Sequence, residues 1–282
     1  MILRRLPVLF ALALLGGCAA QTTRSAAPDG PSLASASAPE LLGILRGRES
    51  ALRSLDALGK IRVEAPQGTR FRASQVVMAM APAAFRIEVL APFGISYVVA
   101  SDGQELAALA TQENSVHRGP ATALSIQRTT GVAANGEEIT ALLLGRPPVT
   151  ADQLRSPWTS RPSGRAGAGA VEVFLHAAVG NSSVVIGFAR VAIERMLVAV
   201  PVSFQRIARN GDRLLKASFE DFTGKKGVLI PRHILIEGGG SSAEIDYRDF
   251  EPNKPLPASA FRLATPPGMQ EVALPTRLPA TP

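Results

Sequence analysis

The spacing of apolar residues changes once near the start of the chain. Between Pro39 and Leu55 the apolar side chains recur at helical intervals, at Leu41, Leu42, Leu45, Leu52 and Leu55, which predicts an amphipathic helix. From Lys60 onward, Lys60, Arg62 and Glu64 alternate with Ile61, Val63 and Ala65. This period of two is typical of half-buried antiparallel strands, which have one apolar and one polar face.

The same alternation returns along most of the chain. It predicts a strand around Phe71, which Arg70 and Arg72 flank, and further strands at Phe85 to Leu90, Ser96 to Ala100, Val171 to His176, Ser183 to Ile193, Val202 to Ala208, Leu214 to Phe222, Val228 to Glu237 and Ala243 to Phe250. The stretch from Thr122 to Leu144 interrupts it and predicts two short helices. We therefore expect an α+β fold in one domain over residues 39–265, followed by a loose, Pro-rich tail over residues 266–282.

The first 17 residues have the features of a secretory signal peptide. Arg4 and Arg5 precede a short apolar run, and Gly16 and Gly17 stand immediately before Cys18. The run Leu-Gly-Gly-Cys resembles the bacterial lipobox, which implies cleavage before Cys18 and lipid attachment to its thiol. The alternative is an ordinary signal peptide with a chance cysteine.

The residues after Cys18 indicate where an anchored protein would go. Position 19 is Ala rather than Asp, which in proteobacterial lipoproteins implies the outer membrane, with the folded part facing the periplasm. The segment to Ala38 is rich in Ala, Ser, Thr and Pro, so residues 18–38 are predicted to be a lipidated cysteine followed by a flexible tether of roughly 25 Å.

Composition narrows the classes of function. Hydrophobic residues make up 46% of the chain and the formal net charge is +7, which excludes a disordered protein. The basic residues are scattered, and with one Trp and two Tyr the aromatic interleaving of a nucleic-acid interface is missing. Nucleic acid is therefore not expected. A mildly basic surface would favour the anionic headgroups of membrane lipids as partners; the alternative is that the charge reflects only an abundance of Arg. A single cysteine excludes a disulfide framework.

Catalytic constellations are not evident. His117, His176 and His233 stand singly, without partners at metal-ligand spacing. No Gly-x-Ser-x-Gly motif occurs, and the glycine-rich runs near Gly167 and Gly238 lack the residues that complete a nucleotide-binding loop. We expect neither an enzyme nor a bound metal or cofactor.

The strands supply apolar area that could serve in two ways. A curved sheet with an aliphatic inner face can either enclose a cavity for hydrocarbon or be filled by its own side chains. Alternation alone nominates the residues that would line such an acyl-chain cavity: Ile61, Val63, Phe85, Ile87, Val89, Tyr97 and Val99.

Three segments resemble one known group of proteins. Ala91-Pro92-Phe93-Gly94 follows a strand, Leu143-Leu144-Gly145-Arg146-Pro147 ends the helical insertion, and Glu244 to Phe250 leads to Phe261-Arg262-Leu263. In this order they resemble the LolA/LolB-like superfamily of periplasmic lipid carriers, and the first two, within Leu55 to Pro148, are similar to LolB. The resemblance implies a half-open barrel: a curved antiparallel sheet with helices over its concave face.

The resemblance also implies a function. LolB-like proteins receive lipoproteins from a LolA-like carrier and insert them into the outer membrane, so the implied ligands are acyl chains. Pro92, Phe93 and Gly94 match the LolB turn that carries an exposed, membrane-inserting leucine; the alternative is that Phe93 folds back into the core. Two other functions stay open, namely an accessory outer-membrane lipoprotein with a solid core and a carrier of another amphiphile such as a glycolipid.

Overall fold

The computed structural model describes residues 32–65, 68, 70–150, 152–165 and 169–275. The predicted signal peptide and the predicted lipid-attachment residue Cys18 lie outside these residues. The described strands are β1 (Ser54–Glu64), β2 (Arg70–Met80), β3 (Ala84–Ala91), β4 (Gly94–Ser101), β5 (Glu105–Ala110), β6 (Ser115–Pro120), β7 (Trp158–Pro162), β8 (Val171–Val179), β9 (Ser182–Ile193), β10 (Met196–Ala208), β11 (Arg213–Lys225), β12 (Val228–Gly238), β13 (Ser241–Pro252) and β14 (Gln270–Ala273). The helices are α1 (Ala38–Ala51), α2 (Ala123–Thr130) and α3 (Gly136–Leu143), with short 3₁₀ turns at Leu33–Ser35, Thr111–Glu113, Gln153–Arg155 and Ala258–Phe261.

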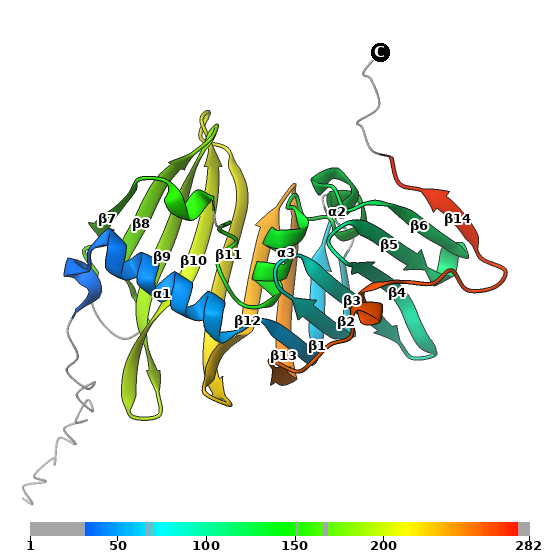
Figure 1. Cartoon of the computed structure of the whole chain (residues 1–282), viewed down its shortest axis with the longest axis horizontal. Coiled ribbons are helices and arrows are strands. Elements are labelled where there is room, and N and C mark those ends of the chain that lie inside the picture. Colours follow the sequence, from blue (N-terminus) through cyan, green and yellow to red (C-terminus); the bar gives the residue numbers. More distant parts are fainter. Residues whose placement is uncertain (1–31, 66–67, 69, 151, 166–168, 276–282) are drawn as a thin grey trace, which may run out of the picture.

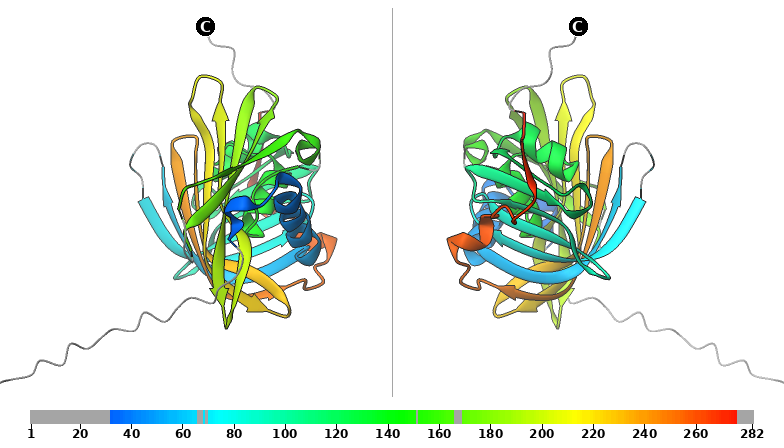
Figure 2. Two further views of the ribbon diagram at one scale, coloured as in Figure 1. Left: turned by 90° about the vertical axis from the view of Figure 1, so that its left-hand side faces the viewer. Right: turned by 90° about the vertical axis from the view of Figure 1, so that its right-hand side faces the viewer.

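The described strands form one large sheet in the order β14-β6-β5-β4-β3-β2-β1-β13-β12-β11-β10-β9-β8-β7. Two meanders, β1 to β6 and β7 to β13, join where β1 pairs with β13. All pairings are antiparallel except that of β14 with β6. The sheet bends into an open half-barrel with the helices inside the bend (Figures 1 and 2), which confirms the predicted fold class.

The helices cover different parts of the concave face. Helix α1 packs on β7 and β10, α3 packs on β2 and β3, and α2 lies against β5. Between them and the sheet, a continuous core includes the fully buried rings of Phe85, Phe188, Phe204, Phe219 and Tyr247. Within the described part of the chain, none of the helices has the length and apolar character of a membrane-spanning segment.

Helix α1 is shorter than the apolar spacing predicted. Ser37 and Glu40 form a capping box at its start, and Pro39 occupies the first turn. The helix ends at Ala51, and Leu55 belongs to β1, where it is fully buried. Because a leucine on the inner face of a strand also points into the core, the spacing alone could not separate the two elements. The two predicted short helices are confirmed as α2 and α3, whereas β5, β6 and β7 were not predicted.

The predicted tether differs from the structure at its end. Leu33–Ser35 forms a 3₁₀ turn that lies against β8, and the Leu33 backbone N–H and the Ser32 hydroxyl both donate to Glu172 Oε2 at 3.1 Å. Glu172 is fully buried and also accepts from Arg190 Nε at 2.7 Å. A buried carboxylate needs such donors, so it fixes a segment whose own composition shows no tendency to order.

The predicted loose tail is also wrong for its described part. Gln270–Ala273 forms β14, which pairs in parallel with β6. Leu274 packs into the core, and its N–H donates to the Arg118 carbonyl at 2.7 Å. The edge of β6 offers unpaired backbone groups, and the tail satisfies them even though its proline content argued against a strand.

Candidate lipid-binding groove

An open groove of about 710 Å³ lies on the inner faces of β1 to β4, beneath the C-terminal end of α2. We call it the β1–β4 groove. Most of its lining is apolar. The lining residues are Ile61, Val63, Phe71, Arg72, Ala73, Ile87, Val89, Leu90, Ala91, Pro92, Ser96, Tyr97, Val99, Ala110, Gln112, Glu113, Thr129 and Thr130.

Strand alternation and register build this surface. Ile61 pairs with Ala73, Ile87 with Val99, and Val89 with Tyr97, so alternate residues of four strands stand in rows on one face. Ala73 is a small residue in this row, and it lines the groove. Space remains at these positions, whereas α3 packs on other parts of β2 and β3 and α1 packs on β7 and β10.

Six of the seven residues predicted to line a cavity are found together in the groove. They are Ile61, Val63, Ile87, Val89, Tyr97 and Val99. Phe85 is the exception. It lies at the start of β3, where α3 covers the sheet, and it is fully buried in the core. Sequence alternation identifies the inner face of a strand, but it cannot show where along the strand a helix ends.

Several groove residues were missed by sequence reasoning. Phe71 and Ala73 continue the alternation of β2, so the same pattern extended by one strand would have found them. Thr129 and Thr130 come from α2. No local signal marks these two threonines, because only the tertiary position of α2 brings them to the groove.

Helix α2 is held over the groove by Tyr97. The Tyr97 hydroxyl donates to the Thr129 carbonyl at 2.8 Å, and the helix ends directly afterwards at Gly131, whose φ is +76°. Burial, with a smaller contribution from the Glu113 carboxylate, raises the pKa of Tyr97 well above its ordinary value. The phenol therefore stays protonated and keeps its donor.

The turn between β3 and β4 is exposed to solvent. It consists of Pro92 and Phe93, and Gly94 follows with φ +124°. The Phe93 ring is fully exposed, at 104% of the reference area, so the alternative in which it packs as core does not hold. Pro92 lines the groove, and the exposed ring is therefore adjacent to the groove mouth.

More apolar and basic side chains surround this turn. Phe71 and Ile95 are each 42% exposed. Ile95 pairs with Leu90, and Phe71 lies three residues before Ser74, which also pairs with Leu90. Arg70 and Arg72 flank Phe71 and are exposed. We call Phe71, Phe93, Ile95, Arg70 and Arg72 the groove rim. An apolar tip with adjacent basic residues is the composition expected at a membrane interface.

Among the three histidines, the structure gives His233 polar neighbours that the sequence did not indicate. Ligand atoms of His233, Glu244 and Asp246 lie within 4.8 Å of one another. Their charges are already paired, because His233 Nδ1 contacts Asp246 Oδ1 at 2.7 Å and Glu244 pairs with Arg62. We therefore assign no ligand to this cluster.

The fold of this chain resembles those of several solved structures. No protein-family model and no curated protein matches the chain. A protein from Vibrio parahaemolyticus described as an outer membrane lipoprotein-sorting domain matches 79% of this chain and 97% of its own, with 11% identity and a TM-score of 0.53. This chain has a LolA-like fold.

Two further structures have comparable coverage. A DUF1329 family protein from Desulfovibrio piger is 13% identical, with a TM-score of 0.52 over 80% of this chain and 95% of that one. A LolA-superfamily protein from Nitrosomonas europaea is 15% identical, with a TM-score of 0.49 over 80% and 98% of the two chains. At these identities the likeness concerns the LolA-like fold, while the groove and its rim are properties of this chain.

Proposed function

We propose that this protein is an outer-membrane lipoprotein that binds acyl chains in the β1–β4 groove and helps to receive lipoproteins and insert them into the membrane. The observation that carries the proposal is the apolar groove of about 710 Å³ with an exposed Phe93 beside its mouth. The LolA-like fold and the lipobox-like Leu-Gly-Gly-Cys before residue 19 support the same conclusion.

The size of the groove suits a hydrocarbon chain. Pockets for small organic ligands have volumes of roughly 300–1,000 Å³. Each methylene that leaves water contributes about 0.8 kcal/mol, so even a partly inserted acyl chain is held by several kcal/mol. The walls offer few polar groups that could discriminate between headgroups, and the ligand is therefore recognised mainly by its tail.

Transfer to the bilayer would proceed downhill in free energy. A LolA-like carrier would deliver the acyl chains, this protein would bind them more tightly than the carrier, and the bilayer would hold them more tightly still. In this scheme no residue of the groove performs covalent chemistry, and the proposed role is that of a carrier rather than an enzyme. The groove rim inserts Phe93 into the interface and places Arg70 and Arg72 near anionic headgroups, which brings the groove mouth to the membrane.

The test is saturable binding of a fluorescent fatty acid to the Cys18→Ala protein, which lacks the acyl-carrying thiol. Ala73→Phe fills the groove and should weaken the probe's affinity about tenfold, because a bulky ring replaces a small wall residue on β2. Ser74→Phe is the matched control, since the next residue of β2 points to the outer face and is exposed; it should leave affinity unchanged.

Absence of saturable binding would favour the accessory lipoprotein with no cargo. Equal affinities for Ala73→Phe and Ser74→Phe would place the bound probe outside the groove. Mass spectrometry of lipids that co-purify with the protein would separate lipoprotein acyl chains from a glycolipid cargo.

A further inference from the structure

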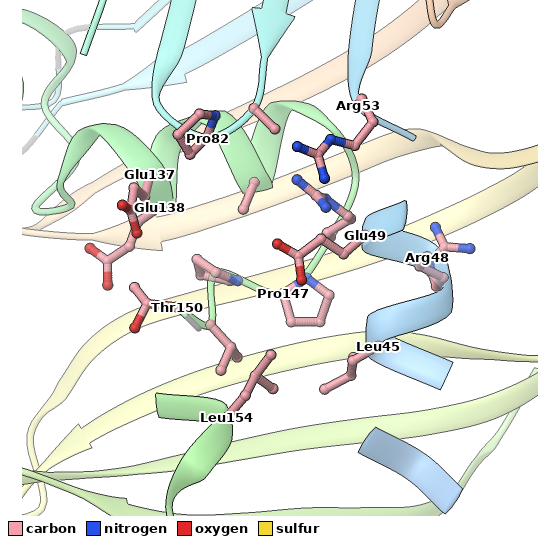
Figure 3. Close-up of a pocket in the computed structure, with 15 residues that line it drawn as sticks. Leu45, Arg48, Glu49, Arg53, Pro82, Glu137, Glu138, Pro147, Thr150 and Leu154 are labelled. Carbon is pink, nitrogen blue, oxygen red and sulfur yellow. The ribbon is translucent and has the colours of Figure 1, made fainter. Parts of the chain in front are cut away.

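A second cavity lies between α1, the turn that joins β2 to β3, and the loop that follows α3 (Figure 3). It shares no residue with the β1–β4 groove. Its volume of about 160 Å³ is well above the roughly 10–15 Å³ that one water requires, so a small polyatomic ligand fits. Its charged lining residues, apart from Glu138, are Arg48, Glu49, Arg53, Glu137 and Arg146.

Arg146 is the unusual member of this cavity. Only 9% of the residue is exposed, yet within the described ranges its guanidinium has neither a hydrogen-bond partner nor an ion-pair partner, and its Nε is sealed from solvent. Burial lowers the pKa of Arg146, and Arg53 lowers it further, while Glu49 raises it. Burying an unpaired cation costs free energy. A ligand in the cavity that accepts hydrogen bonds from Arg146 would reduce this cost.

The backbone holds Arg146 rigidly. The Gly145 N–H donates to the Leu142 carbonyl and the Arg146 N–H to the Ala141 carbonyl, both at 2.9 Å, which is the Schellman motif at the end of α3. Gly145 has φ +66°, and a Cβ there would lie 2.4 Å from the ring of Pro231. The position that follows such a glycine usually packs a hydrophobic side chain against the helix, whereas here it carries a buried arginine.

Other cations share the cavity with Arg146. Arg48 donates to the carbonyls of Gly145 and Leu229 at 3.4 and 3.3 Å, and its Nε has no partner among the described residues. Burial and the charge of Arg146 lower the pKa of Arg48 to about 10. Arg53, which lies between α1 and β1, reaches into the same space (Figure 3). Three arginines therefore line one cavity, and Glu49 is the carboxylate whose charge acts on Arg146.

The carboxylates nearby do not neutralise this cluster. Glu138 is committed to Arg206 and to the start of α3, and Glu137 lies at the opposite end of the cavity (Figure 3). Glu49 points inward from α1, and its charge raises the pKa of Arg146, but among the described residues no ion pair within 4.0 Å joins the two side chains. Pro147 and Pro148 form part of the wall and supply no N–H donor, so the arginines are the positively charged donors of this cavity, beside the hydroxyl of Thr150.

We propose that this cavity binds a phosphate-class oxyanion, with Arg146 as the main donor and Arg53 as the second. A guanidinium presents two parallel N–H groups that match two oxygens of such a group. The bound anion gives the buried guanidinium acceptors and offsets the repulsion among the three arginines. The same chemistry is available from inorganic phosphate and from the phosphate of a lipid headgroup.

The test is isothermal titration of the full chain in detergent, at constant ionic strength, with inorganic phosphate and separately with glycerol 3-phosphate as a soluble headgroup. Arg146→Gln should weaken binding at least tenfold, and Arg53→Gln should weaken it severalfold. Glu49→Gln removes a competing carboxylate and should tighten it. Arg155→Gln, an exposed arginine close by in sequence, is the matched control and should leave affinity unchanged.

Absence of saturable binding with both anions would overturn the proposal, and so would equal affinity in the wild-type protein and Arg146→Gln. If Arg146→Gln does not fold, Arg53→Gln decides: unchanged affinity there overturns the proposal, and weakened affinity supports it. Tighter binding of glycerol 3-phosphate than of phosphate would identify a headgroup as the source, and the reverse order a free anion. These outcomes do not depend on whether the β1–β4 groove binds acyl chains.

Discussion

The Tyr97 hydroxyl lies 2.8 Å from the Thr129 carbonyl and donates a hydrogen bond to it, which links the floor of the β1–β4 groove to the helix above it. Tyr97→Phe removes this bond at little change in shape. We expect the free energy of unfolding to fall by about 1 kcal/mol and amide exchange to accelerate in Ala123–Thr130, with faster release of a bound fatty-acid probe.

Tyr247→Phe is the control for this prediction. Its hydroxyl also donates to a helix-end carbonyl, that of Leu143, at 2.8 Å, but it holds α3 rather than α2. Unaltered exchange in α2 after Tyr97→Phe, or equal acceleration after Tyr247→Phe, would show that Tyr97 does not secure the helix over the groove.

Phe93 is predicted to act at the membrane and not in the fold. Because the ring is fully exposed, Phe93→Glu should leave the melting temperature and fatty-acid affinity unchanged. Burial of a phenyl side chain contributes about 1.5–3 kcal/mol, so binding to vesicles and transfer of acyl cargo into them should fall about tenfold or more. Vesicle flotation of the Cys18→Ala protein measures this effect without an acyl anchor.

Met196→Glu provides the comparison, since Met196 is 65% exposed next to the turn between β9 and β10, away from the groove rim. It should bind vesicles like the parent protein. An equal loss in both variants would indicate a general effect of negative charge instead of insertion by Phe93.

Phe85 and Val89 lie on the same strand, β3, but Phe85 belongs to the core and Val89 lines the groove. Phe85→Ala removes a fully buried ring and should lower the free energy of unfolding by about 3–5 kcal/mol. Val89 lines the groove, so Val89→Ala should lower it by about 1 kcal/mol or less while weakening the fatty-acid probe. Urea denaturation and probe titration measure the two effects; a probe affinity that depends on Phe85 as strongly as on Val89 would contradict the assignment.

The attachment of the segment before α1 should depend on pH. Burial raises the pKa of Glu172, but hydrogen bonds from Arg190, Leu33 and Ser32 outweigh it and hold the pKa below its ordinary value. A lowered pKa in the folded state contributes stability above the unfolded pKa, near 4.5, that is lost as pH falls through the folded pKa.

Glu172→Gln should therefore destabilise the protein at pH 7 by about 2 kcal/mol, and the difference from wild type should shrink below about pH 4.5. Glu64→Gln, which breaks an exposed pair with Arg70, should change stability by less than about 0.5 kcal/mol. Urea denaturation between pH 3 and 7 gives the comparison, and a difference independent of pH would exclude the ionised form of Glu172 as the source.

The sequence predicts the structure of some segments of the chain better than that of others. The alternation of Ile61 and Val63 with Lys60 and Arg62 predicted an antiparallel strand and its inner face, because a strand's side chains must alternate between core and solvent. The curvature of the sheet was implied only by the family resemblance. The same rule failed for the tail, where Gln270–Ala273 pairs with β6 although Pro residues surround it. Pairing there depends on a distant strand edge, which no local pattern reports.

By itself the sequence determined the α+β class, the inner-face residues and the exceptional position of Cys18, since each follows from local spacing and residue type. Tertiary structure decided that Phe85 is core while Val89 lines open space and that Phe93 is exposed. It also decided that Arg146 is buried without a hydrogen-bond partner for its guanidinium in the described part of the chain. The physical reason is that empty volume and unpaired charge depend on where the helices end over the sheet, and those positions are set by contacts between residues far apart in the chain.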